Sequence, residues 1–168
     1  MAYWLDTNVL ILCANKVYPF QKYPEFWKFL SVKFESGEIR SSEFVYREMV
    51  EGNKKATDFL ATWCRSRKST GLNTSATTIE VQNAYKEIVK FAEYEKKYER
   101  YHRTEFYRKA DCWVVAHAKA DGGIVVTHET EREYGKIKVS SICTKMGLKW
   151  MDVYQFRDKL EFDPADYR

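Results

Sequence analysis

The spacing of apolar residues along the chain predicts short strands that alternate with helices. Strand-like apolar stretches occur at Tyr3-Trp4-Leu5, at Ile124-Val125-Val126 and around Leu148 to Met151, with a weaker extended piece at Ile39-Arg40-Ser41. The Ile124–Val126 stretch is β-branched and continuously apolar, which is typical of a central parallel strand. Helical patterns separate these strands, so the sequence predicts an α/β fold with a central parallel sheet of about four to five strands flanked by helices.

The helical segments repeat their apolar residues at a period near 3.6. The predicted helices are a short one over Val9 to Cys13, and others over Pro24 to Glu35, Glu43 to Gly52, Ala56 to Arg67, Ile79 to His102, from Asp111 to before Gly122, and Val153 to Leu160. Gly37 is a typical helix stop, and Ser42 a typical N-cap. On Ala56 to Arg67 we expect Phe59, Leu60 and Trp63 to share the packed side. The Ser/Thr-rich stretch Ser69 to Thr78 predicts a loop inside one domain that spans residues 1–168.

Composition narrows the class of protein. A chain of 168 residues that is 45% hydrophobic and 31% charged has enough apolar residues for a core and too many charges for a membrane protein. The N-terminus lacks the basic start of a signal peptide, so we expect a cytoplasmic protein. Its four cysteines form no C-x-x-C pair and it has three histidines, which argues against a zinc site. The net charge of +4 permits a nucleic-acid partner without requiring one.

Four acidic residues occupy positions where a parallel sheet gathers its site. Asp6 follows the first strand, Glu129 follows Ile124–Val126, Asp111 lies in the first turn of the helix before that strand, and Glu48 lies in the helix after the second strand. Sites in such sheets form at the carboxyl ends of the strands, and clustered carboxylates require a hard divalent cation. Each acid also has an ordinary reading as a turn or cap residue. Asp6 and Asp111 stand in apolar surroundings, where a buried charge needs a partner.

The order of these residues resembles the PIN-domain nucleases, which include the VapC-like toxins of bacterial toxin–antitoxin pairs. Four segments carry the resemblance: Tyr3-Trp4-Leu5-Asp6-Thr7-Asn8-Val9-Leu10, Val45-Tyr46-Arg47-Glu48-Met49, Ala110-Asp111-Cys112-Trp113-Val114-Val115-Ala116 and Val125-Val126-Thr127-His128-Glu129. Asp-Thr-Asn alone is a weak motif, whereas the four segments in order cover most of the chain. The resemblance implies a PIN-like three-layer fold and metal-dependent hydrolysis of RNA phosphodiester bonds.

The resemblance also implies the site residues. Asp6, Glu48, Asp111 and Glu129 are then the catalytic and metal-binding acids, with Mg²⁺ or Mn²⁺ as cofactor. Thr7, Asn8 and Thr127 are expected to orient these carboxylates, although local capping explains them equally well. Many relatives have Asp in the fourth place, whereas a PIN-like subgroup carries Thr-His-Glu as this chain does, and Glu131 is an alternative fourth acid.

The expected RNA contacts lie next to the acids. His128 adjoins Glu129, and the basic stretch Lys96 to Lys109 interleaves cations with aromatic residues and ends beside Asp111. The expected contacts in this stretch are Arg100, Arg103, Arg108 and Lys109. Cations bind phosphates while aromatic rings stack on unpaired bases. The alternatives are a solvated helix with inward-facing aromatic residues for the stretch, and a structural role for His128.

For partners, the resemblance implies an RNA substrate, a cognate antitoxin protein and a homodimer. No membrane partner is expected, because the sequence has no run of about 18 apolar residues. Two other readings stay open. One is an RNA-processing PIN nuclease without an antitoxin. The other is an inactive PIN module that binds RNA or protein, against which the presence of all four acids argues.

Overall fold

A four-stranded parallel sheet forms the centre of the computed structural model, which describes residues 1–51, 58–95, 98–129 and 136–168. The strands are β1 (Tyr3–Leu5), β2 (Ile39–Arg40), β3 (Ile124–Val126) and β4 (Trp150–Met151), in the order β2-β1-β3-β4. In the register, Tyr3 lies opposite both Ile39 and Ile124. The predicted α/β class and parallel sheet are confirmed, and β3 is central as its apolar sequence predicted.

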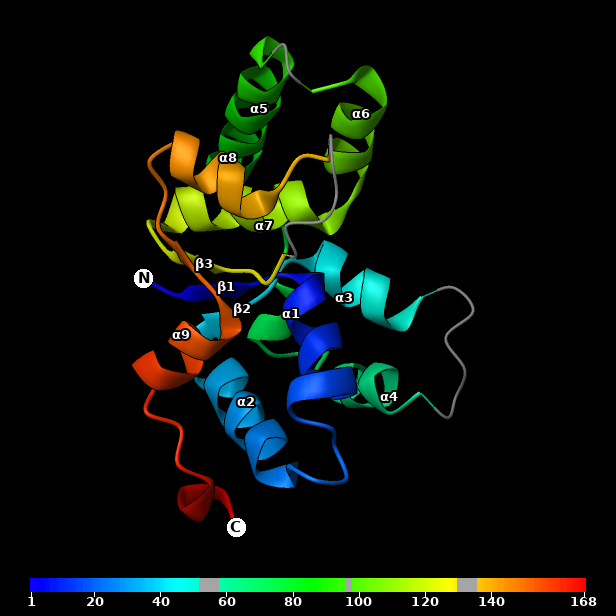
Figure 1. The fold of residues 1–168 in the computed structure, drawn as a ribbon. Helices are drawn as coiled ribbons and strands as arrows, with labels where there is room; N and C mark the ends of the chain where they lie inside the picture. Colours follow the sequence, from blue (N-terminus) through cyan, green and yellow to red (C-terminus); the bar gives the residue numbers. More distant parts are fainter. Residues whose placement is uncertain (52–57, 96–97, 130–135) are drawn as a thin grey trace.

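Helices cover both faces of this sheet, which gives three layers (Figure 1). The helices are α1 (Thr7–Leu12), the π-helix η1 (Cys13–Val17), α2 (Pro24–Ser36), α3 (Glu43–Val50), α4 (Phe59–Arg65), η2 (Gly71–Asn73), α5 (Ile79–Tyr94), α6 (Arg100–Arg108), α7 (Ala110–Asp121), α8 (Val139–Lys145), α9 (Val153–Lys159) and η3 (Pro164–Tyr167). In Figure 1, α5 to α8 lie above the sheet and α2 and α9 lie below it. Within the described residues, no helix has the length and apolarity to cross a bilayer.

Local sequence explains where several helices begin and end. The Ser42 hydroxyl accepts a hydrogen bond from the Phe44 N–H at 3.3 Å and caps α3. Pro24 opens α2, and Gly37 ends it with a left-handed φ of 74° that glycine adopts without a steric penalty. These three boundaries confirm the predictions from sequence. Helix α3 ends at Val50, before the predicted end at Gly52, and Gly52 itself lies outside the described residues.

The predicted long helix over Ile79 to His102 is wrong, because the structure divides it into α5 and α6. A continuous helix would carry later residues away from the core. The break instead buries Tyr98 and Phe106, and α6 packs against α7. Phe59 is a second correction: it is 66% exposed on α4, while the side chains of Ala61 and Trp63 are buried. Helix α8 and η3 were not predicted from the sequence.

A stacked pair of aromatic rings joins the sheet to α7. The Trp4 ring lies 4.5 Å from the His117 ring, nearly parallel to it, and Trp4 Nε1 donates to Asp121 Oδ2 at 3.1 Å. His117 is buried, and its Nε2 has no hydrogen-bond partner among the residues described. Burial lowers the pKa of His117 to about 4, since desolvation penalises the charged imidazolium.

We expect His117 to make the fold sensitive to acid. Its pKa is lower in the folded chain than in the unfolded one, so its contribution is present above about pH 6.5 and is lost as the pH falls towards 4. The loss across this window should be roughly 3 kcal/mol of unfolding free energy. Urea unfolding between pH 4 and 7 tests this, with His117→Phe as the matched variant that keeps a stacked ring. Equal pH dependence in both proteins would contradict the prediction.

Candidate functional site

Asp6 lies at the end of β1, where the chain passes directly into α1. Its side chain is fully buried and caps the helix: Oδ1 accepts from the Val9 N–H at 3.0 Å and Oδ2 accepts from the Thr127 hydroxyl at 2.5 Å. Burial raises the pKa of Asp6 to about 7, and the negative charges of Asp111 and Glu129 add to the increase. The two hydrogen bonds oppose this rise only in part. Asp6 is therefore a cap residue whose negative charge is unfavourable in this buried, acidic environment.

Asp111 lies in the first turn of α7 and faces Asp6 across the ends of the strands. Burial raises its pKa to about 6, with further increases from the charges of Glu48 and Glu129 and an opposing effect of Lys109. The apolar run that follows Asp111 on α7 is buried against the sheet, which fixes the direction of the helix. The carboxyl groups of Asp6 and Asp111 thus both have raised pKa values because they are buried and because other acids of the cluster lie near them.

Glu48 connects α3 to both of these helices. Its Oε2 accepts from the Thr7 hydroxyl at 2.5 Å, and its Oε1 accepts from the Ala110 N–H at 3.0 Å. Thr7 belongs to the first turn of α1, and Ala110 to that of α7, next to Asp111. The structure therefore places Thr7 on Glu48 and Thr127 on Asp6, in contact with the carboxylates that they were expected to orient.

Glu129 has a structural partner that the sequence did not reveal. Its Oε1 accepts from the Val139 N–H at 2.8 Å, and its Oε2 accepts from the N–H and the hydroxyl of Ser140 at 3.1 and 2.9 Å. The carboxylate therefore caps the start of α8, a helix missing from the sequence prediction. Oε2 accepts two hydrogen bonds and Oε1 only one, so a lone pair of Oε1 is left for a ligand contact. Glu131, the alternative fourth acid, lies outside the described residues.

We expect Glu129→Gln to lower the unfolding free energy by about 1–2 kcal/mol. The amide nitrogen of Gln cannot accept, so one of the two N–H donors at the start of α8 loses its partner. Urea unfolding measures this loss, and Ser140→Ala, which removes one of the three hydrogen bonds, should cost less than Glu129→Gln. Unchanged stability of Glu129→Gln would show that the cap contributes nothing.

The charges of the four acids affect the pKa values within the cluster. The charges of Asp111 and Glu129 raise the pKa of Asp6, and those of Glu48 and Glu129 raise the pKa of Asp111. Within the described parts of the chain, no three His, Cys, Asp or Glu side chains are arranged to hold a metal ion. The donor set is nevertheless all oxygen, which suits Mg²⁺ or Mn²⁺ and not zinc. Mg²⁺ commonly keeps several waters and takes one or two carboxylates directly, so Asp6 and Asp111 suffice as a starting pair.

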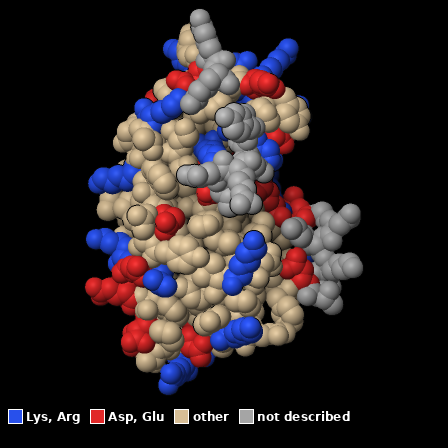
Figure 2. Space-filling model, in the orientation of Figure 1, with Lys and Arg blue, Asp and Glu red and all other residues tan. Residues whose placement is uncertain are grey.

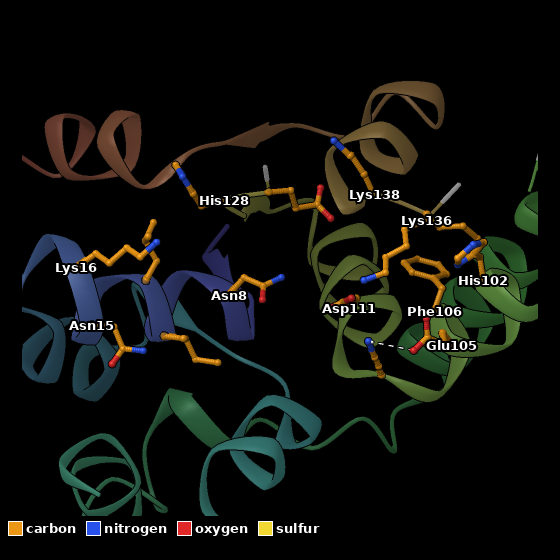
Figure 3. Close-up of a pocket in the computed structure, with 15 residues that line it drawn as sticks. Asn8, Asn15, Lys16, His102, Glu105, Phe106, Asp111, His128, Lys136 and Lys138 are labelled. Atoms are coloured by element: carbon orange, nitrogen blue, oxygen red, sulfur yellow. Dashed lines mark ion pairs between the residues drawn. The ribbon is translucent and has the colours of Figure 1, made fainter. Parts of the chain in front are cut away.

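A cavity of about 620 Å³ is lined by two of these acids, Asp111 and Glu129, whereas Asp6 and Glu48 are not in its lining (Figure 3). It is lined by Asn8, Ile11, Leu12, Asn15, Lys16, His102, Glu105, Phe106, Lys109, Asp111, His128, Glu129, Lys136, Ile137 and Lys138. Among the residues singled out from the sequence, Asn8, His128 and Lys109 also line the cavity. In Figure 3, Asp111 lies between the wall that carries Asn8 and the wall that carries Phe106.

The basic stretch before α7 only partly reaches this cavity. Lys109 lines it, whereas Arg100, Arg103 and Arg108 do not. Arg103 instead pairs with Glu93 on α5, where Nη1 lies 3.5 Å from a carboxylate oxygen. Lys96 and Lys97 lie outside the described residues.

Three residues of the cavity walls were not singled out from the sequence. Lys16 and Asn15 lie on one wall and His102 lies on the facing wall. A signal was present for the first two, because Asn8, Ile11, Leu12, Asn15 and Lys16 share one face of a continued helix. It was overlooked because the predicted helix was ended at Cys13. His102 had no such signal, since its position depends on the break between α5 and α6.

Comparison with known proteins gives a family and a fold. A family model described as a domain of unknown function, DUF4411, matches residues 3–163. No curated protein matches the sequence. Among solved structures, the chain is similar to one from VapBC2 of Rickettsia felis, which is bound to a promoter DNA fragment, and to one from VapBC-1 of nontypeable Haemophilus influenzae. The TM-scores are 0.52 and 0.54, each at 18% identity, and each match covers 90% of this chain and 98% of the other. The likeness confirms the predicted PIN-like three-layer fold.

Proposed function

The chain belongs to the DUF4411 family, and we propose that it is a metal-dependent endoribonuclease that hydrolyses RNA phosphodiester bonds. One observation carries the proposal: Asp6 and Asp111 are buried carboxyl groups, and burial together with the charges of neighbouring acids raises their pKa values to about 7 and about 6. Such an arrangement costs folding free energy unless a cation relieves it. An acidic cluster at the mouth of a cavity is a suitable place for a divalent cation.

Asp6, Glu48 and Asp111 would hold Mg²⁺ or Mn²⁺, with Glu129 extending the cluster. The ion would supply a bound water of lowered pKa and would offset charge on the leaving oxygen. The protein's own groups orient the carboxylates: the Thr127 hydroxyl holds Asp6, and the Thr7 hydroxyl holds Glu48. Partners of this kind are important for the position of a metal ligand. His128 faces the same cavity and is the candidate for a contact to the RNA.

Cleavage of a mixed single-stranded RNA tests the activity. We expect cleavage by the purified protein with Mg²⁺ or Mn²⁺ and none in EDTA. Products seen equally in EDTA would point to a contaminating metal-independent nuclease. Intact RNA with both ions would contradict the proposed function and favour an inactive module that binds RNA or protein.

We further propose that the chain is the toxin of a toxin–antitoxin pair. The support is the VapC-like order of motifs together with the fold that the chain shares with the VapBC structures. Its partners would be a cognate antitoxin and a second copy of the chain. We expect induced expression to arrest growth and co-expression of the neighbouring gene to relieve the arrest. Normal growth despite nuclease activity in vitro would favour an RNA-processing enzyme without an antitoxin.

A further inference from the structure

One wall of the cavity presents five side chains along a single helical face. We call this set the α1–η1 face: Asn8, Ile11, Leu12, Asn15 and Lys16. Their spacing is that of one side of a helix, which α1 begins and η1 continues. The π-helix is closed by the Tyr18 N–H, which donates to the Cys13 carbonyl at 2.8 Å. Such π-helical turns are rare and occur frequently at functional sites.

We propose that the α1–η1 face is a nucleotide subsite, which binds one unpaired nucleotide of a single-stranded RNA beside the bond that is cleaved. Lys16 holds the phosphate, and the base lies against Ile11 and Leu12. The inference rests on the proposed function for the reaction, but the binding itself is measured without cleavage.

Lys16 is the cation of this wall, and it is available. It is exposed and forms no ion pair or hydrogen bond with any residue in the described ranges. Across the cavity, Lys109 already faces Glu105 at 3.5 Å. A phosphate that binds Lys16 therefore displaces no protein partner, and it gains the release of counterions. Binding of the phosphate to Lys16 also places the RNA strand on the opposite side of the cavity from α6.

The rest of the face has the chemistry of a base-binding surface. Ile11 and Leu12 are half-buried aliphatic side chains in the middle of the face, with Asn8 and Asn15 on either side of them along the chain. A nucleobase has apolar faces and a polar edge, and an asparagine amide both donates and accepts hydrogen bonds. On the facing wall, His102 has a buried Nδ1 without a hydrogen-bond partner among the described residues. This arrangement offers packing for the base and polar atoms for its edge.

The size and charge of the cavity favour a single strand. A volume of about 620 Å³ accepts a nucleotide-sized group, but the paired bases of an A-form duplex stay stacked and cannot enter it. Figure 2 shows acidic and basic side chains interspersed over the face in view, and the described residues visible there form no continuous basic track for a duplex backbone. Recognition must then come from the cavity walls, next to Asp111.

Binding of a fluorescein-labelled ten-nucleotide RNA in EDTA, followed by anisotropy, tests the subsite. We expect Lys16→Ala to weaken binding roughly fivefold to tenfold and to reduce the slope of log Kd against log salt by about 0.7, as for one lost phosphate contact. Lys16→Arg should restore affinity. The matched control is Lys28→Ala on α2, an exposed lysine outside the cavity whose loss should leave Kd unchanged. Leu12→Asn should weaken binding of the single-stranded RNA, and the wild-type protein should bind a duplex of the same sequence less tightly than the single strand.

Two further readouts separate this inference from the proposed function. In cleavage assays, Lys16→Ala should raise KM and leave kcat nearly unchanged, and bound RNA should protect Lys16 but not Lys28 from acetylation. Equal affinity of Lys16→Ala and Lys28→Ala overturns the subsite even if the protein cleaves RNA. Lys16-dependent binding without cleavage supports the subsite and contradicts the nuclease. Protection of Lys16 by a co-expressed protein but not by RNA would make this face a protein-docking surface and overturn the proposal.

Discussion

Asp111→Asn is expected to reduce RNA cleavage by about 10³-fold at saturating Mn²⁺, which corresponds to roughly 4 kcal/mol of activation free energy. Asn keeps the size of the side chain and one oxygen, so the helix α7 that starts there should remain folded. It removes the negative charge that faces Asp6, and with it half of the carboxylate pair that we propose to bind the ion. The loss should appear in kcat, because the chemical step needs the ion in place.

The matched control for this prediction is Asp166→Asn, an exposed acid in η3 that is remote in sequence from the cluster. It carries the same change of charge and should cleave at the wild-type rate. The Asp111→Asn protein should show the wild-type circular dichroism spectrum. Cleavage by Asp111→Asn at the wild-type rate would remove Asp111 from the reaction and would exclude the proposed centre.

The sequence predicted the part of the site that depends on strand ends. Asp6 and Asp111 were expected to meet because each adjoins an apolar strand or helix that must be buried, and burial of the neighbours fixes where the charges lie. The same argument places Glu48, whose helix starts from the Ser42 cap. These predictions rest on short-range patterns, such as a cap residue or an apolar run, which the sequence shows directly.

What the sequence did not predict depends on contacts between distant segments. The end of α5 at Tyr94 carries no glycine or proline, and the break is explained only by the burial of Tyr98 and Phe106 in the folded chain. Because this break was not foreseen, α6 was not predicted as a separate helix, and the sequence did not show that its arginines lie outside the lining of the cavity. Helix α8 was missed for a related reason: its cap is Glu129, which precedes it by ten residues.

The second large effect concerns stability. We expect Asp6→Asn to raise the unfolding free energy at pH 8 in EDTA by about 2–4 kcal/mol, or roughly 5–10 °C in Tm. The pKa of Asp6 is raised to about 7 in the folded chain, from 3.8 in a free carboxyl group. Its favourable contribution is therefore complete below about pH 4 and is lost as the pH rises through 7. Asn is neutral at every pH, accepts the Val9 N–H as Asp does, and donates to the Thr127 hydroxyl. The gain over wild type should consequently shrink as the pH falls to 5.

Mn²⁺ should reverse this order of stability, which links the strained carboxylate to the proposed cofactor. The ion stabilises the wild type by binding the folded chain alone, and more at pH 8 than at pH 6, where protons compete for Asp6 and Asp111. Asp6→Asn should gain little. Differential scanning calorimetry measures both effects. The matched control is Asp163→Asn, because the exposed Asp163 also caps a helix, η3, and is not among the charges that raise the pKa of Asp6 or Asp111. A wild-type Tm that Mn²⁺ does not change, or an Asp6→Asn protein less stable than wild type at pH 8, would show that the buried charge of Asp6 is held by the protein alone.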